Sequence, residues 1–268
     1  MSDAGVIAIG WPQLLLATGF VLLVGVLSIR LSLGLERDLA VATLRTYVQL
    51  ALLGFVLRWV FGVDSVWLVL GIVAIMVLMA AWTILRRSPD APRGLFATTA
   101  AAMTLTGFTV TFAVTGLVVQ VDPWYDARYV ITIAGMVLGN SMTGIALALE
   151  RVFADLDARS DDVLALVALG ASPWEAAHDS VRTALRAGLI PTINSMAAVG
   201  IVFIPGMMAG QILAGADPVM ATAYQIVVML MVSAATAIGS VTAVLLSYRR
   251  RFSPDGVFLE KGLRHDAR

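Results

Sequence analysis

Seven long apolar stretches divide the chain, with short polar connections between them. A helix needs about 20 apolar residues to cross roughly 30 Å of hydrocarbon, and each stretch has that reach. The pattern predicts an all-α integral membrane protein with seven transmembrane helices, at residues 11–29, 40–61, 66–85, 95–119, 129–149, 188–213 and 219–247. The first stretch lacks a positively charged start and a clear small-residue cleavage site, so we expect it to be a retained span.

Arginines mark every second connection. Basic residues follow the first, third, fifth and seventh stretches, whereas the connections at 62–65, 120–127 and 214–218 are nearly free of positive charge. Since Lys and Arg near a span favour the cytoplasmic side, we expect the N-terminus outside and a cytoplasmic tail at about 248–268. The spans account for most of the 268 residues. A single transmembrane permease domain covering 1–268, in the cell (inner) membrane, is the expected organisation.

Composition excludes several classes of membrane protein. Hydrophobic residues make up 59% of the chain and charged residues 13%. The absence of cysteine excludes disulfides and thiolate chemistry. The only lysine, Lys261, lies in the tail, in a context that does not fit a P-loop, so the chain lacks an ATPase site of this kind. A retinal Schiff base, which requires a lysine within the bundle, is excluded as well.

The ionisable residues disfavour proton coupling. The 18 carboxylates lie in loops, tails or at span ends, and both histidines, His178 and His265, lie outside the spans. Proton-coupled carriers usually need an intramembrane Asp, Glu or His as a relay. Sodium coupling through backbone carbonyls stays open. We expect any energy input to come from another polypeptide.

The longest connection, about residues 150–187, has the signals of a cytoplasmic helical hairpin between spans five and six. Ser160-Asp161-Asp162 places acceptors and negative charge at a helix start, and Gly170 stands where a left-handed cap would end that helix. Ser172-Pro173-Trp174-Glu175 then has the pattern of a capping box with proline at the first helical position, so a second helix is predicted from Pro173 to about Arg186.

Two interpretations of this hairpin remain open from the residues alone. It is either a structured connector whose apolar face packs on the bundle, or a docking element for a cytoplasmic motor. In the second case Trp174 is an anchor, and the second helix offers further polar side chains to the partner, among them Glu175, His178, Asp179, Arg182 and Arg186.

Polar and small residues gather in the fifth span. Gly135, Gly139 and Thr143 repeat every fourth residue and form a smooth stripe for close helix packing. Asn140, Ser141 and Met142 accompany this stripe. A buried asparagine needs a partner for its amide, so these residues either bond a neighbouring helix or line a substrate path.

The sixth span carries a helix-breaking pair. Pro205-Gly206 removes a helix hydrogen bond, so we expect this span to be kinked or interrupted. Spacings of three and four place a set of residues on one face: Met196, Gly200, Phe203, Met207 and Gln211. These methionines are either adaptable packing or, with Asn194 and Gln211, a path for a soft or borderline metal.

Several segments together resemble one family. They are Arg45–Leu50 (RTYVQL), Gly135–Gly144 with its GNSMTG core, Leu169–Ser172 (LGAS), Ile190–Met196 (IPTINSM) and, most specifically, Pro205–Gly215 (PGMMAGQILAG). The chain is similar over essentially its whole length to the FetB-type family, bacterial ABC-transporter permeases described as iron exporters and related to plant aluminium-tolerance proteins.

The resemblance implies a permease that is not itself an enzyme and binds no cofactor, with ATP used by a separate cytoplasmic ABC ATPase. It implies a homodimer of permeases in membrane lipid, with no nucleic-acid partner, and it makes the hairpin the coupling region. The expected coupling residues are Gly170, Ser172, Trp174, Glu175, His178 and Arg182. Glu175-Ala176-Ala177 is similar to the EAA loop of importers, but Gly170 precedes it here instead of following it, so the direction of transport does not carry over.

Two cargo hypotheses follow. In the first, the permease exports iron or another metal ion along a path lined by Asn140, Ser141, Met142, Asn194, Met196, Met207, Met208 and Gln211. In the second, the cargo is an organic solute such as a nucleotide sugar, because the spans lack the carboxylates that hard cations favour. A secondary carrier, a seven-span receptor and an intramembrane enzyme are weaker alternatives, and the spans show no nucleophile–base pair.

Overall fold

The structure is a computed structural model that describes residues 7, 9–63, 65–87 and 94–259. These residues form nine α-helices, and their only β-type pairings are two isolated bridges. Arg93, Lys261, His265 and the end of the expected tail lie outside the described residues. The described helices include six that are long and apolar enough to cross a membrane: α1 (Trp11–Arg30), α2 (Glu36–Val60), α3 (Val66–Arg87), α4 with a following π-helical turn (Leu95–Val118), α5 (Ala127–Ala158) and α9 with a following 3₁₀ turn (Pro218–Arg251).

The predicted sixth span, 188–213, is not one helix. Its first part is the end of α7 (Pro173–Ala198), and its last part is α8 (Gly206–Leu213). The chain between them is irregular, with Gly200 at a φ of +79°. Pro205 has no N–H to continue a helix, which accounts for the restart at Gly206. The interruption expected from Pro205-Gly206 is confirmed. The prediction that Met196 and Gln211 lie on one face of a single helix is wrong, because they belong to α7 and α8.

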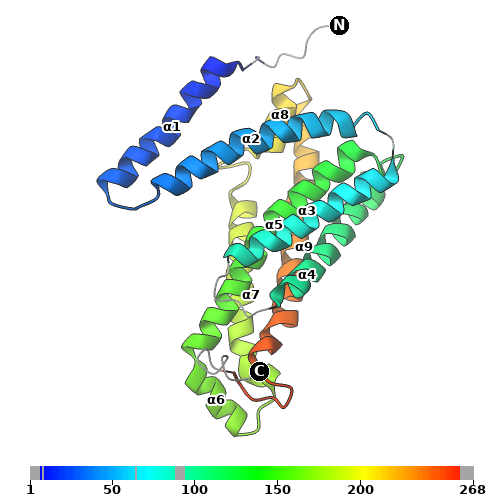
Figure 1. Cartoon of the computed structure of the whole chain (residues 1–268). Coiled ribbons are helices and arrows are strands. Elements are labelled where there is room, and N and C mark those ends of the chain that lie inside the picture. The colour runs from blue at the N-terminus through cyan, green and yellow to red at the C-terminus, as the bar shows by residue number, and fades with distance from the viewer. Residues whose placement is uncertain (1–6, 8, 64, 88–93, 260–268) are drawn as a thin grey trace. The chain divides into compact units, whose positions relative to one another are not determined.

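The helix that begins at Pro173 is also longer than predicted. It continues past Arg186 to Ala198 and contains Pro191 within its length. Because no glycine in a left-handed conformation follows Arg186, nothing in the backbone stops the helix there. One helix therefore runs from the predicted hairpin into the predicted sixth span (Figure 1).

The helices group into two compact units, which are described separately. The first comprises α1, α2 and residues 210–217. Within it, the hydroxyl of Tyr47 in α2 lies 2.6 Å from that of Thr18 in α1 and donates to the Leu14 carbonyl at 2.8 Å. At the turn between the helices, Ser28 donates to Glu36 at 2.8 Å and accepts from the Leu35 N–H. These bonds hold α1 and α2 together as an antiparallel pair.

The second unit contains residues 65–209 and 218–259, and α5 lies at its centre. This helix packs against α3, α4, α7 and α9 (Figure 1). Glycines permit close backbone approach at several of these contacts, among them Gly107, Gly144, Gly188 and Gly239. One apolar core runs from the bundle into the hairpin, and its members include Ile145, Phe153, Leu156, Val163, Val181 and Val244. The hairpin is thus part of the same folded unit as the bundle that it follows.

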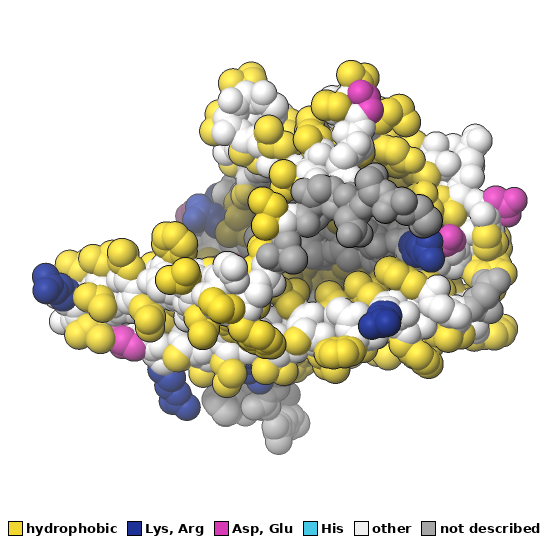
Figure 2. All heavy atoms as spheres, turned by 90° about the horizontal axis from the view of Figure 1, so that it is seen from above, with side chains coloured by type: hydrophobic (Ala, Val, Ile, Leu, Met, Phe, Trp, Pro, Cys, Tyr) yellow, Lys and Arg dark blue, Asp and Glu magenta, His cyan; other side chains and the backbone are white. Residues whose placement is uncertain are grey.

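Apolar side chains also dominate the outside of the helices. Hydrophobic side chains are spread over the face drawn in Figure 2, and charged side chains occur there only at separate points. Leu16 and Phe20 in α1 and Trp67 in α3 are each more than three-quarters exposed. Exposed apolar surface of this extent indicates contact with lipid or with another protein.

Candidate functional site

A cavity of about 490 Å³ lies among α5, α7, α9 and the irregular segment that leads into α8, entirely within the second unit. Its walls come from the first half of α5, the last turns of α7 and the first half of α9, so it is on the opposite side of the bundle from the hairpin. The lining is mostly apolar, with polar side chains at Asn140, Thr143, Thr192, Ser195 and Gln225. A cavity of this size with few polar groups is typical of a small-ligand site.

Gln225 is the most constrained of these polar residues. Its side chain is buried, with 5% of its surface exposed, and Oε1 has no hydrogen-bond partner. A buried acceptor left without a partner costs about 1–3 kcal/mol. Because Gln225 lines the cavity, a ligand or water there can satisfy its oxygen.

Asn140 lines the same cavity and is itself exposed. Its Nδ2 donates to the Met136 carbonyl one turn earlier, at 2.8 Å. The amide is therefore satisfied on its donor side by its own helix, not by a neighbouring helix. Its oxygen is a further acceptor on a residue that lines the cavity.

A close helix contact borders the cavity toward the hairpin. A Cβ added at Gly144 in α5 would lie 2.8 Å from the Gly188 carbonyl oxygen in α7 and would overlap Thr236 Cγ2 in α9. Both glycines line the cavity. Only glycine permits the three helices to approach this closely, and their packing leaves no room for a ligand between Gly144 and Gly188.

The structure separates the residues predicted to line one path. Asn140 and Met207 line the cavity, whereas Ser141 is buried in α5 and donates to the Val137 carbonyl at 2.6 Å. Met142 lines a different groove, against α3, together with Met76 and Met79. Asn194, Met196 and Met208 are not in the cavity lining, and Gln211 lies further along α8, in the first unit.

The smooth stripe predicted on α5, formed by Gly135, Gly139 and Thr143, is not where a neighbouring helix approaches most closely. A Cβ at Gly139 would meet nothing within 4 Å, and one at Gly135 would meet only the tip of Met76, at 3.5 Å. The closest helix approach falls instead at Gly144, one residue beyond the end of the stripe.

The hairpin begins as its local signals predict. Helix α6 (Ser160–Ala168) has Asp161 and Asp162 in its first turn, and Gly170 follows its end with a φ of +92°. At the start of α7 the Glu175 N–H donates to Ser172 Oγ at 3.3 Å, while Glu175 Oε2 accepts from the Ser172 N–H at 2.8 Å and from its hydroxyl at 2.7 Å. These bonds from Ser172 lower the pKa of Glu175 from its ordinary 4.5. The capping box is confirmed.

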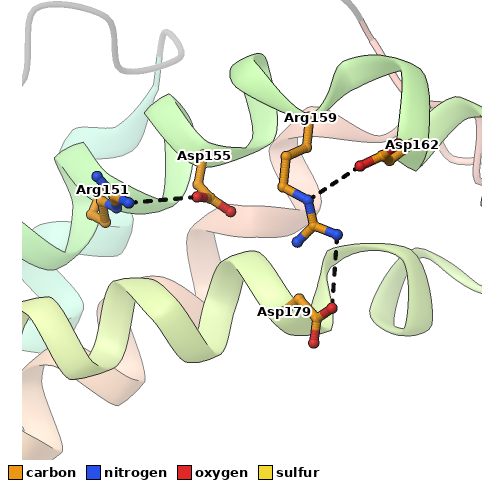
Figure 3. A network of polar contacts seen from close by, with 5 residues as sticks. All are labelled: Arg151, Asp155, Arg159, Asp162 and Asp179. Atoms are coloured by element: carbon orange, nitrogen blue, oxygen red, sulfur yellow. Dashed lines mark hydrogen bonds and ion pairs between the residues drawn. The ribbon is translucent and has the colours of Figure 1, made fainter.

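Ion pairs join the three helices of the hairpin region. Arg159, at the end of α5, pairs with Asp162 in α6 at 3.5 Å and with Asp179 in α7 at 3.7 Å (Figure 3). Figure 3 also shows Arg151 and Asp155 paired along α5, at 3.8 Å. Each pair has at least one partner whose side chain is more than half exposed, so each contributes little by itself. Asp162 and Asp179 share Arg159 as a partner, and this arginine ties the two hairpin helices to α5.

The end of α9 closes over the start of α7. The ring of Trp174 meets those of His178 and Tyr248 edge to face, with centroids 5.4 Å and 5.7 Å apart. Three residues after Tyr248, the guanidinium of Arg251 is fully buried, pairs with Asp157 in α5 and donates to the Leu259 carbonyl at 3.2 Å. Trp174 is therefore partly committed to packing against α9.

An apolar patch remains uncovered at the tip of the hairpin. Leu169, in the turn between α6 and α7, is 86% exposed, and Leu166 and Trp174 are 39% and 42% exposed. Arg182 lies on the exposed face of α7. The inner face of the hairpin packs on the bundle, as the connector interpretation expects, while its tip is exposed. The docking interpretation stays a prediction.

Gln225 is the cavity residue that sequence reasoning missed. The available signal was a lone amide in the otherwise apolar first half of the last span. Thr143, Thr192 and Ser195 were missed as well, since hydroxyls in membrane helices usually bond their own backbone and give no distinct pattern.

The chain is a multi-pass membrane protein, as its six long apolar helices indicate. It belongs to the uncharacterised protein family UPF0014, whose family model matches residues 11–252. It is 34% identical over 241 residues to the probable iron export permease protein FetB of Escherichia coli, covering 90% of this chain and 92% of that protein.

Two further relatives come from a second bacterium and from a plant. The UPF0014 membrane protein YjkA of Bacillus subtilis is 35% identical over 87% of this chain and 92% of its own length. Protein ALUMINUM SENSITIVE 3 of Arabidopsis thaliana is 35% identical over 87% of this chain and 84% of its own length. No solved structure matches the chain.

Proposed function

We propose that this chain is the membrane-spanning subunit of an ABC exporter, driven by a separate cytoplasmic ATPase and exporting a metal ion. The observation that carries the proposal is α7, a single helix that links the hairpin to the cavity. Its first turn holds the Ser172–Glu175 cap beside the exposed tip, and its last turns contribute Thr192 and Ser195 to the cavity. The rise of about 30 Å over the intervening 20 residues is enough to connect a cytoplasmic surface with the membrane interior.

The arginine pattern supports seven crossings, with the sixth made by the broken helix. Basic clusters follow α5 and α9, so both helices end on the cytoplasmic side, and α9 must begin outside. The chain therefore crosses outward between them, through the second half of α7, the break and α8. Interrupted helices in transporters place irregular backbone where it lines a cavity, as residues 203–205 do here.

The hairpin is the proposed docking surface for the ATPase. Its tip exposes Leu169 beside Leu166 and Trp174, and apolar anchors of this kind commonly carry binding energy. Gly170 sets the turn, Ser172 and Glu175 cap α7, and His178 and Arg182 flank the patch on α7. Since α7 and α9 both run from this surface to the cavity, force applied at the tip can move two of its walls. The complex is proposed to contain two copies of the permease.

The name of the Escherichia coli relative supports a metal as cargo. The cavity adds a physical argument, because no ionisable side chain is among the described residues that line it. A nucleotide sugar carries phosphate charges that would have no basic partner there. The organic-solute alternative is therefore the weaker one.

The test is affinity purification of the tagged chain from its native host in mild detergent, beside a Leu169→Asp variant. The proposal expects a P-loop ATPase at one copy per permease with the unmodified chain, and its loss with the variant. The purified complex should then hydrolyse ATP faster when a transported metal is added. Failure to recover an ATPase under conditions that preserve other ABC complexes would contradict the proposal and favour a secondary carrier or receptor.

A further inference from the structure

Two amide oxygens give the cavity a chemical preference. Gln225 in α9 offers a buried Oε1 without a partner, and Asn140 in α5 offers the oxygen of an amide whose nitrogen is bonded to the Met136 carbonyl. Both residues line the cavity, and they approach it from different helices. The buried oxygen of Gln225 requires a hydrogen-bond donor or positive charge from whatever occupies the space, and the exposed Asn140 offers a second acceptor there.

The rest of the lining reinforces this demand. The hydroxyls of Thr143, Thr192 and Ser195 can also accept, and none of the described lining residues is an arginine, lysine or histidine. An anionic ligand would meet no basic side chain in the cavity. A hydrated cation fits the lining, since the ion binds oxygens directly and its water molecules donate to the remaining acceptors.

We infer that Asn140 and Gln225 form a neutral amide-oxygen site for a cation that keeps part of its hydration shell. The inference names the ligand class and the key residues of the proposed transport site, and it rests on the proposed function. Amide carbonyls and water are ligands that Mg²⁺, Ca²⁺ and Mn²⁺ accept, whereas thioethers suit Cu⁺. Met136, Met207 and Met229, which share the cavity, supply its apolar wall.

The dimensions and charge of the site agree with a transient occupant. Six water molecules take up roughly 180 Å³ at their share of liquid volume, which the cavity of about 490 Å³ can hold together with an ion. Among the described residues, no group of three or more His, Cys, Asp or Glu lies close enough together to hold a metal. A site without carboxylates binds a divalent ion weakly, and a transported ion must also be released.

The test uses Mn²⁺, which prefers oxygen ligands and is detected by electron paramagnetic resonance, with the purified full-length chain in detergent. We expect an apparent Kd on the order of 1 mM, the weak end of oxygen-ligand sites. Gln225→Leu should weaken binding about tenfold or more. Gln225→Glu should strengthen it about tenfold or more, because a carboxylate then replaces the amide at the same place, and a misfolded protein would not show such a gain.

Thr222→Val is the matched control. Thr222 lies one turn before Gln225 on α9, is exposed and donates to the Pro218 carbonyl at 2.8 Å. This variant should bind Mn²⁺ as the unmodified chain does.

Several outcomes would overturn the inference. The unmodified chain could fail to bind Mn²⁺, or the Gln225→Leu and Gln225→Glu variants could bind it with equal affinity. Ag⁺ could displace Mn²⁺ from the unmodified chain but not from Met207→Leu, which would indicate a thioether site. Inorganic phosphate could bind in the cavity, which would indicate a site for anions. The proposed function fails separately. If Mn²⁺ binding depends on Gln225 but no ATPase copurifies, the cation site is supported and the exporter proposal is contradicted. If an ATPase copurifies but Mn²⁺ binding does not depend on Gln225, the exporter proposal is supported and the cation site is contradicted.

Discussion

Gly188 in α7 rests directly against Gly144 in α5: a Cβ added to Gly188 would lie 2.7 Å from the Gly144 carbonyl oxygen and 2.9 Å from Ala148 Cβ. The contact lies between the cavity and the core that continues into the hairpin. Under the proposed function, cargo that passes between α5 and α7 requires these two glycines to separate. Under the same proposal, the contact belongs to a conformation that is closed toward the hairpin.

Gly188→Ala tests how tightly this contact is packed. The added methyl group overlaps backbone that has no free space, so we expect the free energy of unfolding to fall by about 1–3 kcal/mol. The measurement is the thermal unfolding temperature of the purified protein in one detergent. Gly139→Ala is the control, because its Cβ would meet nothing within 4 Å. Equal melting temperatures for the two variants would contradict the close contact.

The cap of α7 should make the hairpin sensitive to acid. The bonds from Ser172 lower the pKa of Glu175, so folding favours its ionised form. The contribution is fully present above the unfolded value of 4.5 and is lost as pH falls through the lower folded pKa. We expect Glu175→Gln to reduce the decline of stability below pH 4.5, measured as the difference between the two thermal unfolding profiles across pH 3–6. Parallel profiles would show that the carboxylate is not held by Ser172.

Arg251→Met should release the end of the chain from α5. It leaves Asp157 without its buried partner, and since Asp157 is a quarter exposed and can be hydrated, we expect the loss of this charged hydrogen bond to cost about 1.5–3 kcal/mol. Since Arg251 also donates to the Leu259 carbonyl, hydrogen exchange at residues 252–259 should accelerate. Arg250→Ala removes an exposed neighbour and serves as the control. Unchanged exchange in Arg251→Met would mean that the aromatic pair of Phe252 and Phe258 holds this segment alone.

Arg182→Ala should weaken retention of the ATPase without unfolding the hairpin. Its side chain is exposed on α7, so the substitution leaves the apolar core intact. We expect a severalfold loss of copurified ATPase with an unchanged melting temperature. Glu175→Ala is unsuitable for this purpose, because it also removes the cap of α7. Full retention in Arg182→Ala would exclude this face of α7 from the docking surface.

Local signals in the sequence were sufficient for most helix positions. Trp11–Arg30 and Val66–Arg87 agree closely with the first and third predicted spans, since about 20 apolar residues bounded by polar ones specify a membrane helix without reference to the rest of the fold. The turn at Gly170 and the capping box at Ser172 were equally predictable, because their hydrogen bonds involve residues only a few positions apart.

The length of α7 and the composition of the cavity were not predictable in this way. Whether a helix continues past Arg186 or resumes at Gly206 depends on what its sides pack against, and apolar periodicity is the same for a continuous and a broken helix. The separation of Asn140 from Met142, and the meeting of Asn140 with Gln225, depend on how α5 is rotated against α7 and α9. That rotation follows from Gly144 and Gly188, two glycines 44 positions apart whose contact exists only in the folded chain. The sequence by itself therefore determined the membrane helices and the capped hairpin, and the tertiary structure decided which polar side chains share a cavity, because helix contacts in a membrane depend on close surface fit between distant residues.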